Sequence, residues 1–263
     1  MRLCSIASGS SGNCVYVGSE ATHLLVDVGI SGKRVEEGLA TLELTGGDLD
    51  GILITHEHTD HIAGLCVISK KYHIPIYATE GTIQAIQNCK NAPDPELFRQ
   101  IAADEKFVVK DLTVAPMRIS HDAAQPVAYR IGYGNHRVAV CTDLGVYNDY
   151  TVECLKGMDA LLLEANHDIN MLQVGPYPYY LKQRILGEKG HLSNENAGRL
   201  LSRVLCDRTK AVVLGHLSKE NNLPELAYEA VRMEITMGDC PYRAEDFQMM
   251  VAKRSQPSEV IEL

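Results

Sequence analysis

Histidine and carboxylate side chains are concentrated in residues 55–61, directly after the apolar run at 51–54. Alternate residues of an extended chain point to the same side, so His56 and His58 can bind one metal ion. Asp60 and His61 lie where the chain turns toward a helix, and they can serve a second ion. Imidazole and carboxylate ligands suit Zn, Mn or Fe, and the lack of thiolates argues against a closed structural zinc site. The alternative interpretation is a solvated histidine-rich loop.

Strands and helices must hold these residues in place. In the first half, apolar runs between turn residues predict strands at 3–7, 14–17, 23–26 and 51–54, with helices at 32–42, 61–72 and 79–88. After a break rich in Pro and Asp at 92–95, strands are predicted at 106–109, 112–119, 127–133, 137–141, 160–163 and 211–214, with helices at 150–156, 193–205 and 224–237. We therefore expect an α/β fold in a single domain, 1–263, with two similar halves at roughly 1–110 and 111–263.

Composition narrows the class of protein. The 263 residues are 45% hydrophobic, which is enough for a sizeable core. No apolar run reaches the roughly 18 residues that span a bilayer, and the first residues do not resemble a secretory signal, so we expect a soluble cytoplasmic protein. The formal charge of −9 argues against a protein that coats nucleic acid by bulk electrostatics, although it does not exclude a nuclease. Eight scattered cysteines without a Cys-x-x-Cys pair predict reduced thiols.

The His-x-His-x-Asp-His motif after a strand resembles the hallmark of the metallo-β-lactamase superfamily. That superfamily also has acidic and histidine residues at the ends of other strands, and this sequence has them in the same order: Asp27, His121, Asp143 and His216. The resemblance implies a metallo-β-lactamase αββα sandwich, with two mixed β-sheets flanked by helices.

The resemblance also implies two divalent metal ions. It assigns the first ion to His56, His58 and His121, and the second to Asp60, His61 and His216. Asp143 would bridge the two ions, since two dications about 3.5 to 4 Å apart need an anionic bridge. Asp27 would fix the orientation of a ligand. Taken singly, each later residue is more often a cap or a hydrogen-bonding group, and the ordered set is what favours ligation.

Two downstream motifs indicate which chemistry the ions serve. Glu164 ends a buried apolar strand, and Gly190-His191-Leu192-Ser193 places a histidine at a helix start. The pair resembles tRNase Z and β-CASP nucleases, in which an acidic residue orients a histidine that protonates the leaving oxygen. The resemblance thus makes Glu164 and His191 catalytic, together with Asp60. A carboxylate partner favours charged imidazole, as a general acid requires. The alternative for His191 is a helix-capping residue.

The motifs at 8–13, 164–168, 190–194 and 216–222 resemble the YycJ/WalJ group of metallo-β-lactamase-fold proteins over nearly the whole chain. That group implies 5′ to 3′ exonuclease activity on DNA in repair, with nucleic acid as the partner and DNA preferred over RNA. The chain has no insertion of β-CASP size between Glu164 and His191 and no long arm like that of tRNase Z, which argues against tRNA 3′ processing.

Polar residues in the same motifs are candidate phosphate contacts. The glycine- and serine-rich loop at 8–13 offers backbone N–H groups, and its alternative interpretation is a simple turn. Ser193 is equally a helix cap. The candidates are Ser10, Ser11, Asn13, Ser193, Ser218, Lys219 and Asn221.

Other functions stay open at this level. A glyoxalase II-like thioester hydrolase would share the metal motif but would not explain Glu164 with His191, and an RNA-processing nuclease would share both. A redox di-iron protein would need an electron carrier, for which the sequence has no flavin-binding segment. A metal sensor would not require an acid and its orienting residue.

Overall fold

The computed structural model describes residues 1–263, whose strands form two mixed sheets of seven strands each. Contacts divide the chain into two units. Unit 1 comprises Met1–Arg118, Ala123–Asn135 and Lys253–Leu263, and unit 2 comprises Ile119–Asp122 and His136–Ala252. The chain passes between the units after residues 118, 122, 135 and 252, so residues 123–135 and the last eleven residues also belong to unit 1. The expectation of a single domain stays a prediction. No helix is long and apolar enough to cross a membrane.

Unit 1 contains a seven-stranded sheet with the order β14-β1-β2-β3-β4-β5-β6. Its strands are antiparallel from β14 to β3 and parallel from β3 to β6. Three further strands, β7, β8 and β9, pair antiparallel. The bounds are β1 Arg2–Ala7, β2 Cys14–Gly18, β3 His23–Val26, β4 Gly51–Leu53, β5 Ile76–Thr79, β6 Phe98–Ile101, β7 Phe107–Val109, β8 Leu112–Arg118, β9 Val127–Tyr133 and β14 Ile261–Glu262.

Parallel pairing of β3 and β4 positions the metal motif. Leu24 lies opposite Gly51 and Val26 opposite Leu53, so both strands end at the same edge of the sheet. The residues that follow them, Asp27 and the segment from Thr55, therefore meet at this edge. Parallel neighbours require a crossover connection, which helix α1, Gly32–Ala40, provides.

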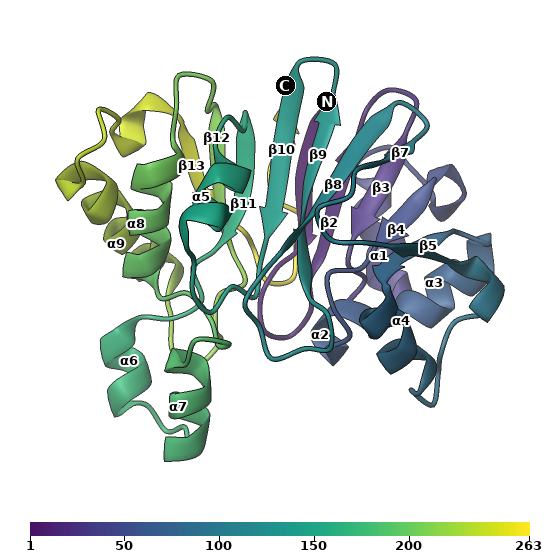
Figure 1. Cartoon of the computed structure of the whole chain (residues 1–263), viewed down its shortest axis with the longest axis horizontal. Helices are drawn as coiled ribbons and strands as arrows, with labels where there is room; N and C mark the ends of the chain where they lie inside the picture. The colour runs from purple at the N-terminus through teal and green to yellow at the C-terminus, as the bar shows by residue number, and fades with distance from the viewer. The chain divides into compact units, whose positions relative to one another are not determined.

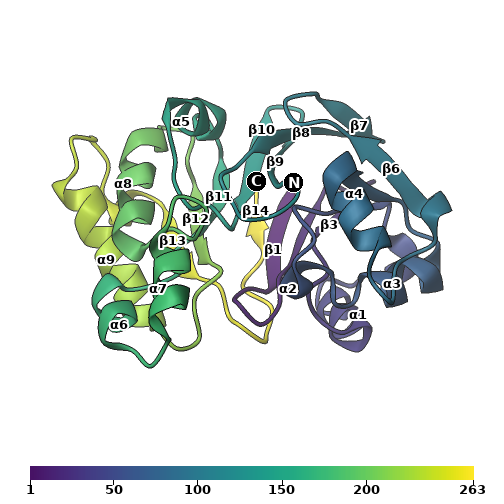
Figure 2. The ribbon, with the colours of Figure 1, turned by 60° about the horizontal axis from the view of Figure 1, so that its bottom comes forward.

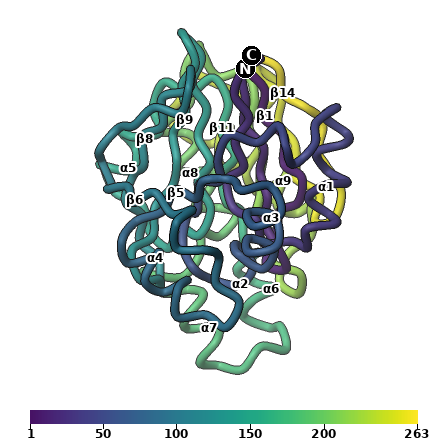
Figure 3. Tube along the Cα trace, turned by 90° about the vertical axis from the view of Figure 1, so that its right-hand side faces the viewer, coloured from purple at the N-terminus to yellow at the C-terminus, as the bar shows by residue number.

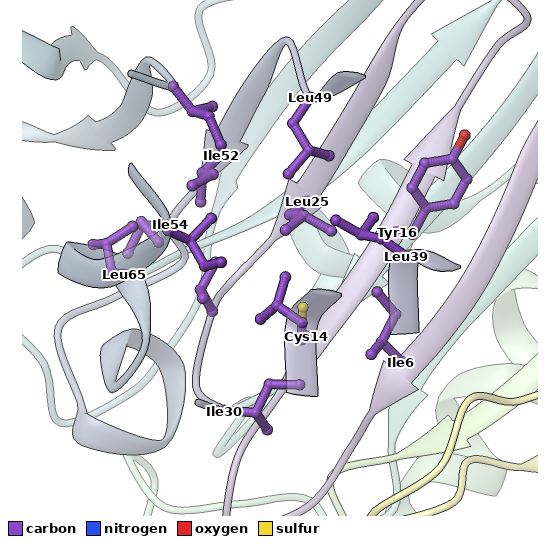
Figure 4. Close-up of a cluster of buried hydrophobic side chains, with 14 of the residues drawn as sticks. Ile6, Cys14, Tyr16, Leu25, Ile30, Leu39, Leu49, Ile52, Ile54 and Leu65 are labelled. Atoms are coloured by element: carbon purple, nitrogen blue, oxygen red, sulfur yellow. The ribbon is translucent and has the colours of Figure 1, made fainter. Parts of the chain in front are cut away.

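Helices of unit 1 cover a face of its sheet, and an apolar core lies between them (Figure 4). Ile6, Tyr16 and Leu25 of β1 to β3 belong to one cluster with Leu39 of α1 and Leu65 of α3, and Figure 4 shows Leu39 next to Tyr16 and Leu65 next to Ile54. The helices are α1 Gly32–Ala40, α2 Thr59–Ile62, α3 Leu65–Tyr72 and α4 Glu80–Gln87, with 3-10 turns η1 Gly46–Asp48 and η2 Pro95–Leu97.

The helix expected at 61–72 is in fact two helices, so that expectation was wrong. The chain breaks between α2 and α3, where the Gly64 N–H donates to the Val28 carbonyl. A Cβ atom on Gly64 would lie 2.0 Å from the Ile30 carbonyl oxygen, so only glycine allows this approach. Because of this break, Asp60 and His61 lie on a separate short helix, α2.

Unit 2 contains four parallel strands in the order β13-β12-β11-β10. Cys141 lies opposite Leu163, and Glu164 opposite Gly215, so β10, β11 and β12 end at one edge. Asp143, Glu164 and His216 lie at or just beyond these ends. The bounds are β10 His136–Cys141, β11 Ala160–Glu164, β12 Ala211–Gly215 and β13 Gln248–Val251.

The helices of unit 2 fall into two groups in Figure 1. Helix α8 lies beside α9, and Arg199 of α8 forms two hydrogen bonds with Glu234 of α9. Helices α6 and α7 lie together in the connection that leaves the end of β11, which Figure 2 shows from another side. The bounds are α5 Asp149–Leu155, α6 Ile169–Val174, α7 Tyr179–Leu186, α8 Asn194–Val204, α9 Pro224–Met237 and the 3-10 turn η3 Ala244–Asp246.

The sequence predicted no strand at β5, β6, β13 or β14 and no helix at α6 or α7. The β6 strand has only one buried residue in four, so its apolar pattern is weak. The β14 strand has two residues and forms only by pairing with β1, at the opposite end of the chain. Figure 3 shows the two termini side by side, and the Leu263 N–H donates to the Met1 carbonyl at 2.9 Å.

Gly29 provides a test of how closely the strand-end loops of unit 1 are packed. A Cβ atom there would lie 1.7 Å from the Asp60 carbonyl oxygen, which cannot move without shifting the metal motif. We expect Gly29→Ala to lower the free energy of unfolding by about 1–3 kcal/mol, measured by urea denaturation of metal-free protein. Gly47→Ala is the matched control, because its nearest neighbouring atom is 3.6 Å away. Equal midpoints for the two variants would contradict this packing.

Candidate functional site

Asp27 organises the candidate ligands of unit 1. It is 2% exposed, and its Oδ1 accepts from the Thr55 N–H at 2.8 Å. Its Oδ2 accepts from the Thr55 hydroxyl at 2.8 Å and from His61 Nδ1 at 2.7 Å. A protonated Nδ1 leaves the lone pair of His61 on Nε2, which lies 3.6 Å from Asp60 Oδ2. Asp27 thus fixes the orientation of the His61 imidazole, and the role of that imidazole as a metal ligand stays a prediction.

The other two histidines of the motif lie next to His61. The ring centroids of His56 and His58 are 4.5 Å apart, and those of His56 and His61 are 4.2 Å apart. His56 Nδ1 is 3.0 Å from the Thr55 hydroxyl, which already donates to Asp27, so Nδ1 acts as the donor and the lone pair lies on Nε2. The alternation of an extended chain places the rings of His56 and His58 together, whereas His61 reaches them from α2, and their binding of a shared ion stays a prediction.

The loop at 8–13 is held against this motif. The Asn13 N–H donates to the Asp60 carbonyl at 2.8 Å. The Asn13 side chain is buried, accepts from the Gly9 N–H at 3.0 Å and lies 3.2 Å from His61 Nε2. Ser11 is exposed and accepts from Arg254 Nη1 at 3.3 Å. Asn13 thus stabilises the loop, whereas the exposed Ser11 hydroxyl lies next to the guanidinium of Arg254.

Glu164 organises the candidate site of unit 2. Its side chain is fully buried, and Oε1 lies 2.8 Å from His191 Nδ1 and 2.7 Å from His216 Nδ1. Its Oε2 accepts from the backbone N–H groups of Leu144 at 2.9 Å and Leu192 at 3.1 Å. Burial acts to raise the pKa of Glu164, but the charges and hydrogen bonds of the two imidazoles outweigh it and lower the pKa. The carboxylate is therefore ionised and fixes two imidazoles.

Asp143 and His121 lie beside this pair. Asp143 Oδ1 is 3.6 Å from His121 Nε2 and 3.6 Å from His216 Nδ1. His121 Nδ1 donates to the Gly190 carbonyl at 3.2 Å, so its lone pair also lies on Nε2. Burial lowers the pKa of His121, which favours the neutral form that binds metals. Candidate ligand atoms of Asp143, Glu164, His191 and His216 lie within 4.8 Å of one another.

The donor set in each unit fits a divalent metal ion. Metal-binding imidazoles characteristically donate Nδ1–H to a carboxylate or carbonyl and coordinate through Nε2. His61, His121 and His216 follow this rule, with Asp27, Gly190 and Glu164 as their partners. The chain therefore has a His/Asp cluster able to bind metal ions.

Three site residues adopt the left-handed backbone region. Asp27, Asp143 and His216 have φ values of 61°, 58° and 55°, and each follows a strand directly or by one residue. This conformation costs roughly 1–2 kcal/mol for a residue with a side chain. It turns the chain sharply at the strand end, which aims each side chain across the edge of its sheet.

Comparison with known proteins assigns the family. Residues 22–217 match the model of the "Beta-lactamase superfamily domain". The chain belongs to the metallo-β-lactamase superfamily. Its two mixed sheets flanked by helices are the fold of that superfamily, and a metallo-β-lactamase-fold protein of Bacillus subtilis, YhfI, superposes with a TM-score of 0.71 at 18% identity, covering 98% of both chains.

Two relatives of this metallo-β-lactamase-fold chain carry an activity in their names. It is 42% identical over 234 residues to "Exodeoxyribonuclease YycJ" of Bacillus anthracis, covering 86% of each protein. It is 40% identical over 242 residues to "Exodeoxyribonuclease WalJ" of Streptococcus pneumoniae serotype 2, covering 89% of this chain and 88% of the relative. The resemblance to the YycJ/WalJ group is thereby confirmed.

The structure separates the candidate phosphate contacts into two sets. Four are buried and have local structural contacts: Asn13, Ser193, Ser218 and Asn221. The Ser193 hydroxyl caps α8 by accepting from the Asn196 N–H, and the Ser218 hydroxyl accepts from the Asn221 N–H. The exposed set is Ser10, Ser11 and Lys219. A phosphate role for any of the seven stays a prediction.

Sequence reasoning missed the asparagines that connect the strand-end loops of unit 2. Asn166 Nδ2 donates to the His216 carbonyl at 2.8 Å. Asn222 Nδ2 donates to the carbonyls of Ala165 and Asn166 and to Asn194 Oδ1. The repeated asparagines in these motifs were the available signal, but only the folded chain shows which carbonyls they bind.

His167 is a second residue to which the sequence gave no role. It is 1% exposed, and neither ring nitrogen has a hydrogen-bond partner. Burial lowers its pKa from 6.5 to about 4, despite the opposing charge of Glu164. The imidazole is therefore neutral at physiological pH, and its protonation opposes folding.

This burial predicts a pH-dependent stability. The unfolded chain binds a proton on His167 near pH 6.5, whereas the folded chain binds it only near pH 4. His167 therefore favours folding above pH 6.5, and its contribution to the free energy of unfolding is lost as the pH falls from 6.5 toward 4. We expect metal-free wild-type protein to lose up to about 1.4 kcal/mol more per pH unit than His167→Gln between pH 6.5 and 4.5. Urea denaturation at several pH values measures both slopes, and parallel slopes would contradict the assignment.

Proposed function

We propose that this chain is a dinuclear-metal-dependent phosphodiesterase that removes nucleotides from the 5′ end of DNA in repair. The observation that carries the proposal is the hydrogen bond between the Glu164 carboxylate and the imidazole of His191, next to candidate metal ligands. The names of the relatives at 40–42% identity support a nucleic acid substrate and favour DNA over RNA. A cytoplasmic location is part of the same proposal.

We assign the ligands as the family pattern implies. His56, His58 and His121 would hold one ion, Asp60, His61 and His216 the other, and Asp143 would bridge them. The protonated Nδ1 of His61, His121 and His216 supports coordination through Nε2 in each case. Zn, Mn and Fe all suit this set of donors. Two such ions, when bound, would lower the pKa of water and stabilise charge on the phosphate oxygens.

His191 would supply the proton for the leaving group. Its side chain is 15% exposed, whereas its carboxylate partner Glu164 is fully buried. The short contact between Nδ1 and Oε1 orients the ring and occupies Nδ1, so Nε2 is the nitrogen left to release a proton toward solvent or substrate. Water attacks phosphorus opposite the departing 3′ oxygen, and His191 protonates that oxygen. Ser10, Ser11 and Lys219 are exposed groups suited to the neighbouring phosphates.

The function is tested by incubating end-labelled, 5′-phosphorylated single- and double-stranded DNA and RNA with Mn²⁺-loaded protein. We expect mononucleotides to be released from the 5′ end of DNA, faster than from RNA. Asp60→Ala, which removes a proposed metal ligand and catalytic residue, should abolish release and reduce bound metal. Turnover of RNA alone would indicate an RNA-processing nuclease, and turnover of a glutathione thioester without cleavage of nucleic acid would indicate a glyoxalase II-like hydrolase.

The role of His191 has its own test. His191→Ala should lower kcat by about 10² to 10⁴ at unchanged metal content, because a general acid contributes this much. A substrate with sulfur in place of the leaving 3′ oxygen needs no protonation, so it should restore most of the lost rate. A variant that is equally slow on both substrates would indicate that His191 only positions its neighbours.

A further inference from the structure

Two neighbouring tyrosines are exposed on the α6–α7 hairpin, residues 169–186. Tyr179 is 75% exposed and Tyr180 is 74% exposed, at the first two positions of α7. They are the only tyrosine or phenylalanine side chains among the strongly exposed large hydrophobic residues of the chain, and Val174, at 86%, lies at the end of α6. Exposing aromatic rings in pairs contributes nothing to a monomer core, so the pair suits a binding partner with flat apolar surfaces.

The hairpin also differs in charge from the rest of the chain. Besides Arg184, which pairs with Asp122, residues 169–190 contain two lysines, Lys182 and Lys189, and a single acidic residue, Glu188, whereas the whole chain has a formal charge of −9. A local excess of cations beside exposed rings complements a partner that combines negative charge with stacked planar groups. Nucleic acid has this combination, since its phosphates are anionic and each base has an aromatic face.

The hairpin is joined rigidly to the candidate site of unit 2. Arg184 Nε and Nη2 both donate to the Asp122 carboxylate, which adjoins His121. The His191 N–H donates to the Ile185 carbonyl at 3.0 Å, so the end of α7 is bonded to the proposed acid. Figures 1 and 2 show α6 and α7 side by side, and Lys182 Nζ donates to the Gln173 carbonyl across the hairpin.

The approach to α7 is also preorganised. Pro176 and Pro178 flank Tyr177 just before the helix, and Pro178 forms its N-cap with φ of −63°. Proline fixes φ near −65°, so few conformations are lost when this segment binds a ligand. The tyrosine pair is thus presented by a stiff turn.

We propose that the α6–α7 hairpin is a docking surface for unpaired nucleotides of the substrate strand, with bases stacked on Tyr179 and Tyr180. This inference rests on the proposed nuclease function and adds the part of the substrate that the site recognises. Lys182 and Lys189 contact the backbone phosphates of the docked nucleotides. The surface holds the strand end close to His191.

Binding is tested with a fluorescent probe that the composition allows. The chain contains no tryptophan, so Tyr179→Trp introduces a single one at the proposed stacking position. In a His191→Ala background with Mn²⁺, which slows turnover, short 5′-phosphorylated oligothymidylate should quench its fluorescence saturably. Met237→Trp is the matched control, because Met237 is 74% exposed on α9 of the same unit. Quenching equal to that of the control would overturn the proposal.

Turnover separates this inference from the proposed function. Tyr179→Ala should raise KM for single-stranded DNA roughly 5- to 150-fold with little change in kcat, because base stacking contributes that much per base, and Tyr179→Ala/Tyr180→Ala should raise KM further. Tyr179→Phe/Tyr180→Phe keeps the rings and should behave as wild type, as should Met237→Ala. Wild-type cleavage with an unchanged KM for the double alanine variant would overturn the docking surface and leave the nuclease standing.

Two remaining outcomes also decide the matter. Wild-type protein that cleaves no nucleic acid would remove the proposed nuclease, and quenching of Tyr179→Trp by oligothymidylate would then still support nucleic acid docking. Light scattering after size exclusion tests whether the tyrosines bind a second copy instead. The proposal would be overturned if wild-type protein were an oligomer, Tyr179→Ala/Tyr180→Ala were a monomer, and both bound oligothymidylate equally well.

Discussion

The buried carboxylate of Glu164 is the interaction on which the site of unit 2 depends. One oxygen accepts from two imidazoles and the other from two backbone N–H groups, so every part of the charge is compensated. A buried ion whose partner is removed costs about 3–5 kcal/mol, and therefore this arrangement allows little freedom to either histidine. These contacts compensate the buried charge and occupy Nδ1 of both rings. Coordination by His216 and proton release by His191, as proposed, would therefore both use Nε2.

Unit 1 uses the same device on a different set of residues. Asp27 is buried after β3, and it binds both the backbone of Thr55 and the Nδ1 of His61. In each unit, a carboxylate at one strand end connects to loops from neighbouring strands, and it orients imidazoles that are candidate metal ligands. Parallel pairing makes this possible, because consecutive parallel strands end at one edge of a sheet. The left-handed backbone of Asp27, Asp143 and His216 is the local strain that this edge requires.

The connection between β11 and α8 links the site to its surroundings. It begins after Glu164, forms the α6–α7 hairpin and ends at His191, so the proposed general acid and the carboxylate that orients it lie at its two ends. Arg184 pairs with Asp122 next to His121, and this pair fixes the hairpin to a loop that carries a candidate ligand. The buried side chains of Asn166, Asn194 and Asn222 also connect the strand-end loops of unit 2 by hydrogen bonds. A substrate docked on the hairpin is therefore held by the elements that hold the site.

The sequence by itself determined most strand ends, the order of the candidate ligands and the family, because these depend on spacing along the chain. His56, His58, Asp60 and His61 are local neighbours, and most strands around them are apolar runs with clear turns. Only the tertiary structure decided that Glu164, besides His191, also binds His216, 52 residues away, and that Asn13 and Asn221 are buried. It also decided that Gly64 divides a helix, that β14 pairs with β1, and that Tyr179 and Tyr180 are exposed. Each of these depends on which distant residues pack together, and a pattern of neighbours along the chain does not contain that information.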